Sequence, residues 1–196
     1  MLHIVDDEEV IRDALIWLAQ SRRIDAVGYD GARAFLDALG PDYAFSAQGD
    51  CLLLDMRMPD MSGALLFDTL AARGLVQRMP VIFLTGHGDV PMAVDSLKRG
   101  AFDFFEKPFN DNKLMDRVLE ALQASLAAGD QAQVQARLAS LSSREREVMD
   151  LMLEGKLNKV IADLMGISMR TVEVHRSHIL AKMRVRTAVE LARLLK

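Results

Sequence analysis

A short, wholly apolar segment that ends in a carboxylate constrains this chain more than any other feature. Residues 51–54 (Cys-Leu-Leu-Leu) run without alternation into Asp55, and Pro59 follows four positions later. A short apolar run of this kind is typical of a strand that is buried on both faces of a parallel sheet. Asp55 would then lie at the carboxyl end of that strand, where open α/β sheets bind their ligands.

The other apolar runs in the first part of the chain share this pattern, because each leads into a polar side chain. These side chains are Asp6 and Asp7 after residues 2–5, Thr85 after residues 80–84, and Lys107 after residues 102–105. The carboxyl ends of parallel strands meet at one edge of a sheet. We therefore expect one crevice to collect three carboxylates, a hydroxyl and an ammonium.

Strand-like and helix-like patterns alternate up to about residue 128. The expected strands are residues 2–5, 24–29, 51–55, 80–84 and 102–105, and the expected helices are residues 8–21, 31–39, 63–73, 91–99 and 110–128. This alternation predicts an α/β fold, a doubly wound (βα)5 domain with a parallel sheet and helices on both faces. The connection at residues 40–50 is long for such a fold.

The pattern changes at Leu141, after which no strand-like run occurs. Ser142 and Glu145 fit a capping box, Asn158 and Ser168 are expected to cap two further helices, and Thr187 a last one. A short helix, a tight turn and a longer helix with a polar face predict a helix-turn-helix. We therefore expect an α/β domain at 1–125, a partly helical linker at 126–140 and an all-α four-helix domain at 141–196.

The charge is divided unevenly along the 196 residues. Residues 141–196 hold 11 Lys/Arg and 7 Asp/Glu, whereas the first 140 hold 13 and 21. This split indicates two domains with different partners, and the basic one would suit nucleic acid. The amino end carries no basic signal-peptide region, no apolar run reaches membrane-spanning length, and the single Cys51 cannot form an internal disulfide. We expect a cytoplasmic protein without a membrane partner.

The carboxylates of Asp6, Asp7 and Asp55 would repel one another unless a cation joined them. Hard oxygen ligands favour Mg²⁺, and an aspartate beside such an ion can act as a nucleophile toward phosphorus. Lys107 would neutralise charge on a transferred phosphoryl group, and Thr85 would donate a hydrogen bond to its oxygens. The alternative is that Asp6 and Asp7 only cap the first helix, but it leaves the other strand-end residues unexplained.

The same residues, together with Gly86 and the Lys107-Pro108 pair, resemble the CheY-like receiver domain of bacterial response regulators, most closely the FixJ subgroup. The resemblance implies transfer of a phosphoryl group from a sensor histidine kinase to Asp55, in a protein that is no enzyme beyond its own phosphotransfer and dephosphorylation. It also implies a site for Mg²⁺ or Mn²⁺ and a two-residue switch. The metal ligands would be Asp7, Asp55 and the Arg57 backbone carbonyl, with Asp6 through water; the switch would be Thr85 and Phe104. A cis bond is expected at Lys107-Pro108.

Residues 141–196 resemble the LuxR/NarL-type DNA-binding domain, through motifs such as Thr171-Val-Glu-Val-His175 and Lys182-Met183. The resemblance implies that residues 171–182 form the recognition helix. The residues expected nearest bases are Glu173, Val174 and Ser177, and those expected nearest phosphates are Lys159, Arg170, Thr171, Arg176, His178 and Lys182, with Asn158 at the helix start. Glu173 would accept from a cytosine amine or pair with a neighbouring arginine.

Taken together, these features predict a FixJ-type response regulator that binds promoter DNA as a phosphorylation-promoted homodimer. RNA polymerase is a further candidate partner. A phosphotransfer or sequestration module is a second hypothesis, and a haloacid dehalogenase-type phosphatase is a third. The third lacks a second aspartate two residues after the nucleophile, where Arg57 stands.

A few side chains are expected to serve packing rather than chemistry. We expect His3 in the core, His175 in a packing role and His87 in a surface loop. Trp17, at helical spacing with apolar neighbours, is expected to be buried or partly buried, with a kinase-docking face as the alternative.

Overall fold

The computed structural model describes residues 1–40, 43–86 and 90–195 of the chain. The chain folds into two compact units, Met1–Gly129 and Asp130–Lys196. Each unit has a hydrophobic core of its own. His87, expected in a surface loop, lies outside the described residues.

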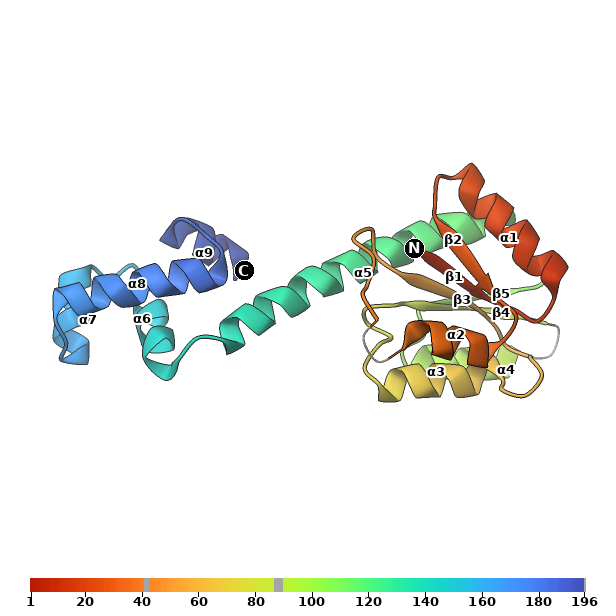
Figure 1. Cartoon of the computed structure of the whole chain (residues 1–196), viewed down its shortest axis with the longest axis horizontal. Coiled ribbons are helices and arrows are strands. Elements are labelled where there is room, and N and C mark those ends of the chain that lie inside the picture. Colours follow the sequence, from red (N-terminus) through yellow and green to blue (C-terminus); the bar gives the residue numbers. More distant parts are fainter. Residues whose placement is uncertain (41–42, 87–89, 196) are drawn as a thin grey trace. The chain divides into compact units, whose positions relative to one another are not determined.

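The first unit is built on a sheet of five parallel strands, as the alternation of patterns predicts (Figure 1). The strands are β1 (Leu2–Val5), β2 (Ala26–Tyr29), β3 (Cys51–Asp55), β4 (Val81–Thr85) and β5 (Asp103–Glu106). Their order in the sheet is β2-β1-β3-β4-β5. The chain order therefore reverses between β1 and β3, and a crevice opens at the carboxyl ends of strands at such a switch point.

Helices cover both faces of this sheet. On one face lie α1 (Glu9–Ser21) and the first part of α5 (Asp111–Ala139); on the other lie α2 (Ala32–Leu39), α3 (Gly63–Ala72) and α4 (Val90–Lys98) (Figure 1). Because β3 and β4 are buried on both faces, every residue of these two strands is buried. The doubly wound (βα)5 prediction is confirmed.

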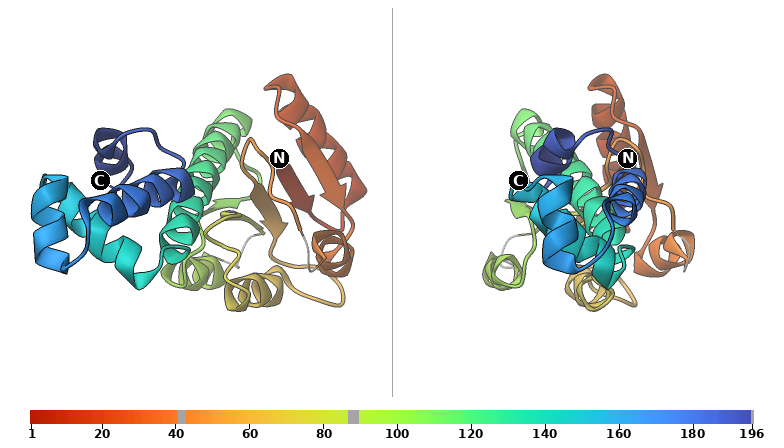
Figure 2. Two further views of the ribbon diagram at one scale, coloured as in Figure 1. Left: turned by 60° about the vertical axis from the view of Figure 1, so that its left-hand side comes forward. Right: turned by 90° about the vertical axis from the view of Figure 1, so that its left-hand side faces the viewer.

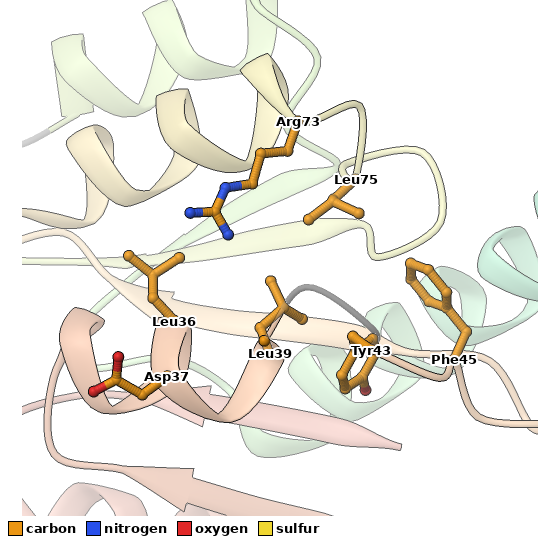
Figure 3. Close-up of a pocket in the computed structure, with 8 residues that line it drawn as sticks. Leu36, Asp37, Leu39, Tyr43, Phe45, Arg73 and Leu75 are labelled. Carbon is orange, nitrogen blue, oxygen red and sulfur yellow. The ribbon is translucent and has the colours of Figure 1, made fainter.

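The long connection before β3 covers a buried polar cluster. His3 is 2% exposed, and its two ring nitrogens lie 3.2 Å from the Tyr29 hydroxyl and 2.9 Å from the Tyr43 hydroxyl. Leu36, Tyr43, Phe45 and Arg73 line a hollow of about 770 Å³ beside it (Figure 3). The hollow lies at the end of the sheet opposite to Asp55, since it is formed where α2 and α3 end. His3 is a core residue, as expected.

The prediction for Trp17 is wrong. α1 buries Leu15 and Ala19 against the sheet. Trp17 lies two positions from each of them, about 200° around a helix. Its side chain therefore faces away from the core and is 71% exposed.

The second unit contains α6 (Ser143–Leu153), α7 (Asn158–Met165), α8 (Met169–Met183) and α9 (Ala188–Leu194), together with the end of α5. α8 packs against both α6 and α7 (Figure 2). Ser142 and Glu145 form the expected capping box, and the Ser168 side chain caps α8. Asn158 does not cap α7, because Leu157 occupies the N-cap position and Asn158 is the first helical residue.

α5 is longer than the sequence pattern predicts. It continues from Asp111 to Ala139, through most of the segment expected to be a linker. Val134 and Leu138 near its end pack against the core of the second unit. Within the described ranges, no helix combines the length and apolarity needed to cross a membrane.

Candidate functional site

Side chains from three strand ends meet at the switch point of the sheet. The Lys107 ammonium, which follows β5, donates to Asp6 Oδ2 at 2.8 Å and to Asp55 Oδ1 at 2.6 Å. Asp6 follows β1 and is fully buried, whereas Asp55 ends β3 and is 6% exposed. The Lys107 ammonium thus links the carboxylates of Asp6 and Asp55, which are far apart in the sequence, as the strand-end pattern predicts.

Backbone contacts fix the two carboxylates. The Arg57 amide donates to Asp55 Oδ2 at 2.7 Å, and the Glu8 amide donates to Asp6 Oδ1 at 2.9 Å. Gly63, the first residue of α3, lies so close to β3 that a Cβ there would stand 2.1 Å from the Asp55 carbonyl oxygen. The start of α3 can therefore approach Asp55 only because residue 63 has no side chain.

Burial and charge act on Asp55 in opposite directions. Burial raises the pKa of the Asp55 carboxyl, the hydrogen bond and charge of Lys107 lower it, and Asp6 raises it again; the net direction is upward. Burial lowers the pKa of Lys107, but hydrogen bonds to Asp55 and Asp6 outweigh burial and raise it. Lys107 is therefore an ammonium at neutral pH, and the two carboxylates still repel each other beside it.

The donor set suits the divalent cation that the receiver resemblance implies. Asp6 and Asp55 offer hard carboxylate oxygens, which Mg²⁺ prefers. Burial is the main cause of the raised pKa of Asp55, and the charge of Asp6 adds to it. An added cation would favour the ionised form of Asp55 against both. Asp7 is exposed beside Asp6. Among the described residues, however, no three His, Cys, Asp or Glu side chains are gathered as metal ligands.

Thr85 ends β4, the strand next to β3, and Phe104 lies on β5, the strand next to β4. Thr85 is fully buried, and its hydroxyl donates to the Phe105 carbonyl at 3.5 Å. The Lys107 amide donates to the Thr85 carbonyl at 2.8 Å, which ties β5 to β4 at this edge. Phe104 is half-buried against the core beneath α3 and α4. The peptide bond between Lys107 and Pro108 is cis, as expected.

The candidate DNA-contacting residues are gathered mostly on α8. This helix buries Val172, Ile179 and Met183. The rest of α8 presents exposed or half-buried polar and small side chains, namely Arg170, Thr171, Glu173, Val174, Arg176, Ser177, His178 and Lys182. Asn158 and Lys159 stand at the start of α7. The arrangement is that of a helix-turn-helix with one free face on its longer helix.

Two of these residues contact Glu145, which the sequence pattern identifies only as part of a helix cap. The Lys182 ammonium donates to Glu145 Oε2 at 2.7 Å and to the Ser140 carbonyl at 3.1 Å. His178 Nδ1 lies 3.8 Å from Glu145 Oε1. The capping-box pattern predicts the contact of Glu145 with its own helix start, but no sequence signal points to Lys182, 37 positions away.

Family models match both units. Residues 2–119 match the response regulator receiver domain, and residues 139–195 match the bacterial regulatory proteins of the luxR family. The chain therefore belongs to the two-component response regulators, as a receiver domain followed by a LuxR-type DNA-binding domain. It is a transcriptional regulator by family rather than a classical enzyme.

Several relatives match along nearly the whole chain. The C4-dicarboxylate transport transcriptional regulatory protein DctR of Rhodobacter capsulatus is 56% identical over 98% of each chain. The transcriptional regulatory protein FixJ of Rhizobium meliloti (strain 1021) is 42% identical over 98% of this chain and 93% of that one. Among solved structures, response regulator StyR is 37% identical over 99% of this chain and 96% of that one, with a TM-score of 0.74. Full-length FixJ from B. japonicum is 41% identical over 98% and 94%, with a TM-score of 0.59.

Proposed function

We propose that Asp55 is the phosphoacceptor of this response regulator and that its phosphorylation controls DNA binding by the second unit. The observation that carries the proposal is the Lys107 ammonium, bound to both Asp6 and Asp55 at the carboxyl ends of the strands. A carboxylate that is held in place, nearly buried and flanked by a fixed cation has the surroundings that phosphoryl transfer needs.

In this reaction a carboxylate oxygen of Asp55 forms a bond to phosphorus while the bond between phosphorus and the donor's imidazole nitrogen breaks. The electron pair of that bond leaves with the imidazole of the sensor kinase. Lys107 neutralises charge on the phosphoryl oxygens, and the Thr85 hydroxyl turns from the Phe105 carbonyl to donate to one of them. Phe104 moves inward with Thr85.

A divalent ion, Mg²⁺ or Mn²⁺, would be held by Asp6, Asp7, Asp55 and the Arg57 backbone carbonyl. The ion, when bound, supplies positive charge that offsets the negative charge of the phosphoryl oxygens and of the paired carboxylates. Hydrolysis of the acyl phosphate at this site is the only further chemistry that we assign to the chain.

The second unit binds promoter DNA through the exposed face of α8. Glu173, Val174 and Ser177 would lie nearest base edges, and Glu173 would accept from a cytosine amine. The residues expected nearest the phosphates of the DNA backbone are Lys159, Arg170, Thr171 and Arg176, with Asn158 beside them at the start of α7. His178 and Lys182 belong to the same predicted set, but both also lie beside the Glu145 carboxylate.

The proposal keeps the predicted boundaries, with the receiver at 1–125, a linker at 126–140 and the DNA-binding domain at 141–196. Phosphorylation would promote a homodimer whose two recognition helices read an inverted repeat. RNA polymerase would be a further partner at the promoter. These partners would be met in the cytoplasm.

The test of the phosphoacceptor is mass labelling by a small phosphodonor such as acetyl phosphate in the presence of Mg²⁺. The unmodified chain should gain one phosphoryl group, and Asp55→Asn should gain none. Asp60→Asn is the matched control, because Asp60 is an exposed carboxylate in the loop that follows β3. Normal labelling of Asp55→Asn would refute the assignment.

A further inference from the structure

The buried carboxylate of Glu145 links α6 to α8 in the DNA-binding unit. Glu145, in the first turn of α6, is 4% exposed. One of its oxygens, Oε2, accepts from the Ser142 amide at 2.7 Å and from the Lys182 ammonium at 2.7 Å. Lys182 lies in the last turn of α8. Glu145 therefore contacts both the start of α6 and the end of the predicted recognition helix.

The Lys182 ammonium is held by more than one acceptor. Besides Glu145 it donates to the Ser140 carbonyl at 3.1 Å, in the turn that precedes α6. These two acceptors use two of the three N–H donors of the ammonium. If Lys182 moved outward to a DNA phosphate, the Glu145 carboxylate would lose its charged partner. Only the carboxylate end of this pair is buried, since the Lys182 side chain is 39% exposed. Loss of the ammonium is still unfavourable, because it would leave the charge of Glu145 without its partner in a place that water reaches poorly.

The protonation state of Glu145 agrees with this arrangement. The hydrogen bonds from Lys182 and from the Ser142 amide lower the pKa of Glu145 to about 2. The carboxylate is therefore ionised throughout the range in which DNA binding would be measured. Its exposed neighbour Glu147 pairs with Arg144 on the same helix and touches no other element through that pair.

We infer that Glu145 is a positioning residue for the recognition helix, and that Lys182 acts on DNA binding by anchoring α8 to Glu145 rather than by contacting a phosphate. The inference rests on the proposed DNA-binding function of the second unit. It removes Lys182 from the set of phosphate contacts and adds Glu145, a buried residue of another helix, to the residues that determine affinity.

The two roles of Lys182 predict opposite effects of Glu145→Gln. This variant removes a negative charge and frees Lys182, while Gln can still cap α6. If Lys182 were a phosphate contact restrained by Glu145, the variant would bind DNA more tightly. If Glu145 positions α8, the variant binds more weakly, by about tenfold, the size of a typical coupling between residues in contact.

The experiment measures binding of the full-length variants to a labelled random-sequence DNA duplex as a function of salt. Lys182→Met should weaken binding without changing the salt slope, because no phosphate contact is lost. A slope reduced by roughly 0.9, as expected for one lost phosphate contact, would overturn the inference. Binding by Glu145→Gln that equals or exceeds that of the unmodified chain would overturn it too.

The double variant gives a second readout. Glu145→Gln in the Lys182→Met background removes the unpaired carboxylate, so the double variant should bind at least as tightly as Lys182→Met alone. Additive losses would mean that the two residues act separately and would contradict the inference. Glu147→Gln, on the exposed side of α6, is the matched control and should leave binding unchanged.

A folding control and the binding of the unmodified chain separate failure of this inference from loss of the fold and from failure of the proposed function. Far-UV circular dichroism at the assay temperature shows whether each variant is folded. If Glu145→Gln is unfolded, the test depends on the salt slope of Lys182→Met, because this variant leaves the capping box intact. Failure of the unmodified chain to bind any duplex, with or without phosphodonor, would instead refute the proposed DNA-binding function.

Discussion

At the scale of single residues, Lys107 decides how two carboxylates share one crevice. Its ammonium lies within 2.8 Å of both Asp6 and Asp55, and it is the cation that makes their close approach tolerable. The pKa of Asp55 is still raised, with burial as the largest cause. Lys107 therefore does not fully offset the cost of burying the Asp55 charge beside Asp6, and a further cation would favour the ionised carboxylate.

Lys107→Met tests whether the Lys107 ammonium compensates the charges of Asp6 and Asp55. The variant should lose roughly 1–3 kcal/mol of stability to urea at neutral pH, because two nearly buried carboxylates would lose a hydrogen-bond donor and face each other without a partner. Added Mg²⁺ should recover part of the loss, since the ion would replace the missing charge. Lys113→Met, at an exposed position on α5, is the control and should change little. A Lys107→Met variant as stable as the parent would mean that Lys107 does not compensate the carboxylates.

At the scale of elements, the start of α3 is fitted to the end of β3. A Cβ at Gly63 would stand 2.1 Å from the Asp55 carbonyl oxygen, so the helix or the strand would have to move. Gly63→Ala should therefore cost roughly 1–3 kcal/mol and slow labelling of Asp55 by a phosphodonor. Gly31→Ala is the matched control, because nothing lies within 4 Å of a Cβ there. Equal effects of the two changes would contradict this interpretation of the β3–α3 junction.

The contact between α6 and α8 should depend on pH through Glu145. The pKa of Glu145 is lowered from its ordinary value of 4.5 to about 2, chiefly by the hydrogen bond from Lys182. A lowered pKa contributes stability above the ordinary value, and this contribution is lost as the pH falls from 4.5 toward about 2. Amide hydrogen exchange of α6 and α8 in the full chain should report that loss. In Glu145→Gln the loss over this window should be absent, whereas in Glu147→Gln it should remain.

Some elements could be predicted from the sequence because a local pattern determines them. The apolar runs located all five strands, and the strand-end residues Asp6, Asp55 and Lys107 meet as expected. Other features depend on tertiary contacts. Trp17 is exposed because only one stripe of α1 meets the sheet. α5 continues past Gly129 through a Gln/Ala-rich stretch in which only Val134 and Leu138 mark a helical spacing, and these two residues pack on the second unit's core.

At the scale of the whole molecule, a receiver and a DNA-binding unit are joined in one chain through α5. Each unit has its own core, and the excess of acidic residues falls in the first part of the chain while the basic excess falls in the second. The contact between Lys182 and Glu145 shows why the functional residues of such a chain are harder to predict than its fold. Lys182 looks like a phosphate contact in the sequence, and only the packing of α8 on α6 reveals its partner.

The central claim is that a phosphoryl group on Asp55 changes the affinity of the second unit for DNA. The measurement that tests it most directly is binding of the full chain to random-sequence duplexes, with and without acetyl phosphate and Mg²⁺, compared with binding by Asp55→Asn. We expect the phosphodonor to strengthen DNA binding by the unmodified chain roughly fivefold or more and to leave binding by Asp55→Asn unchanged. An equal gain in Asp55→Asn, or no gain in an unmodified chain that carries the phosphoryl group, would contradict it.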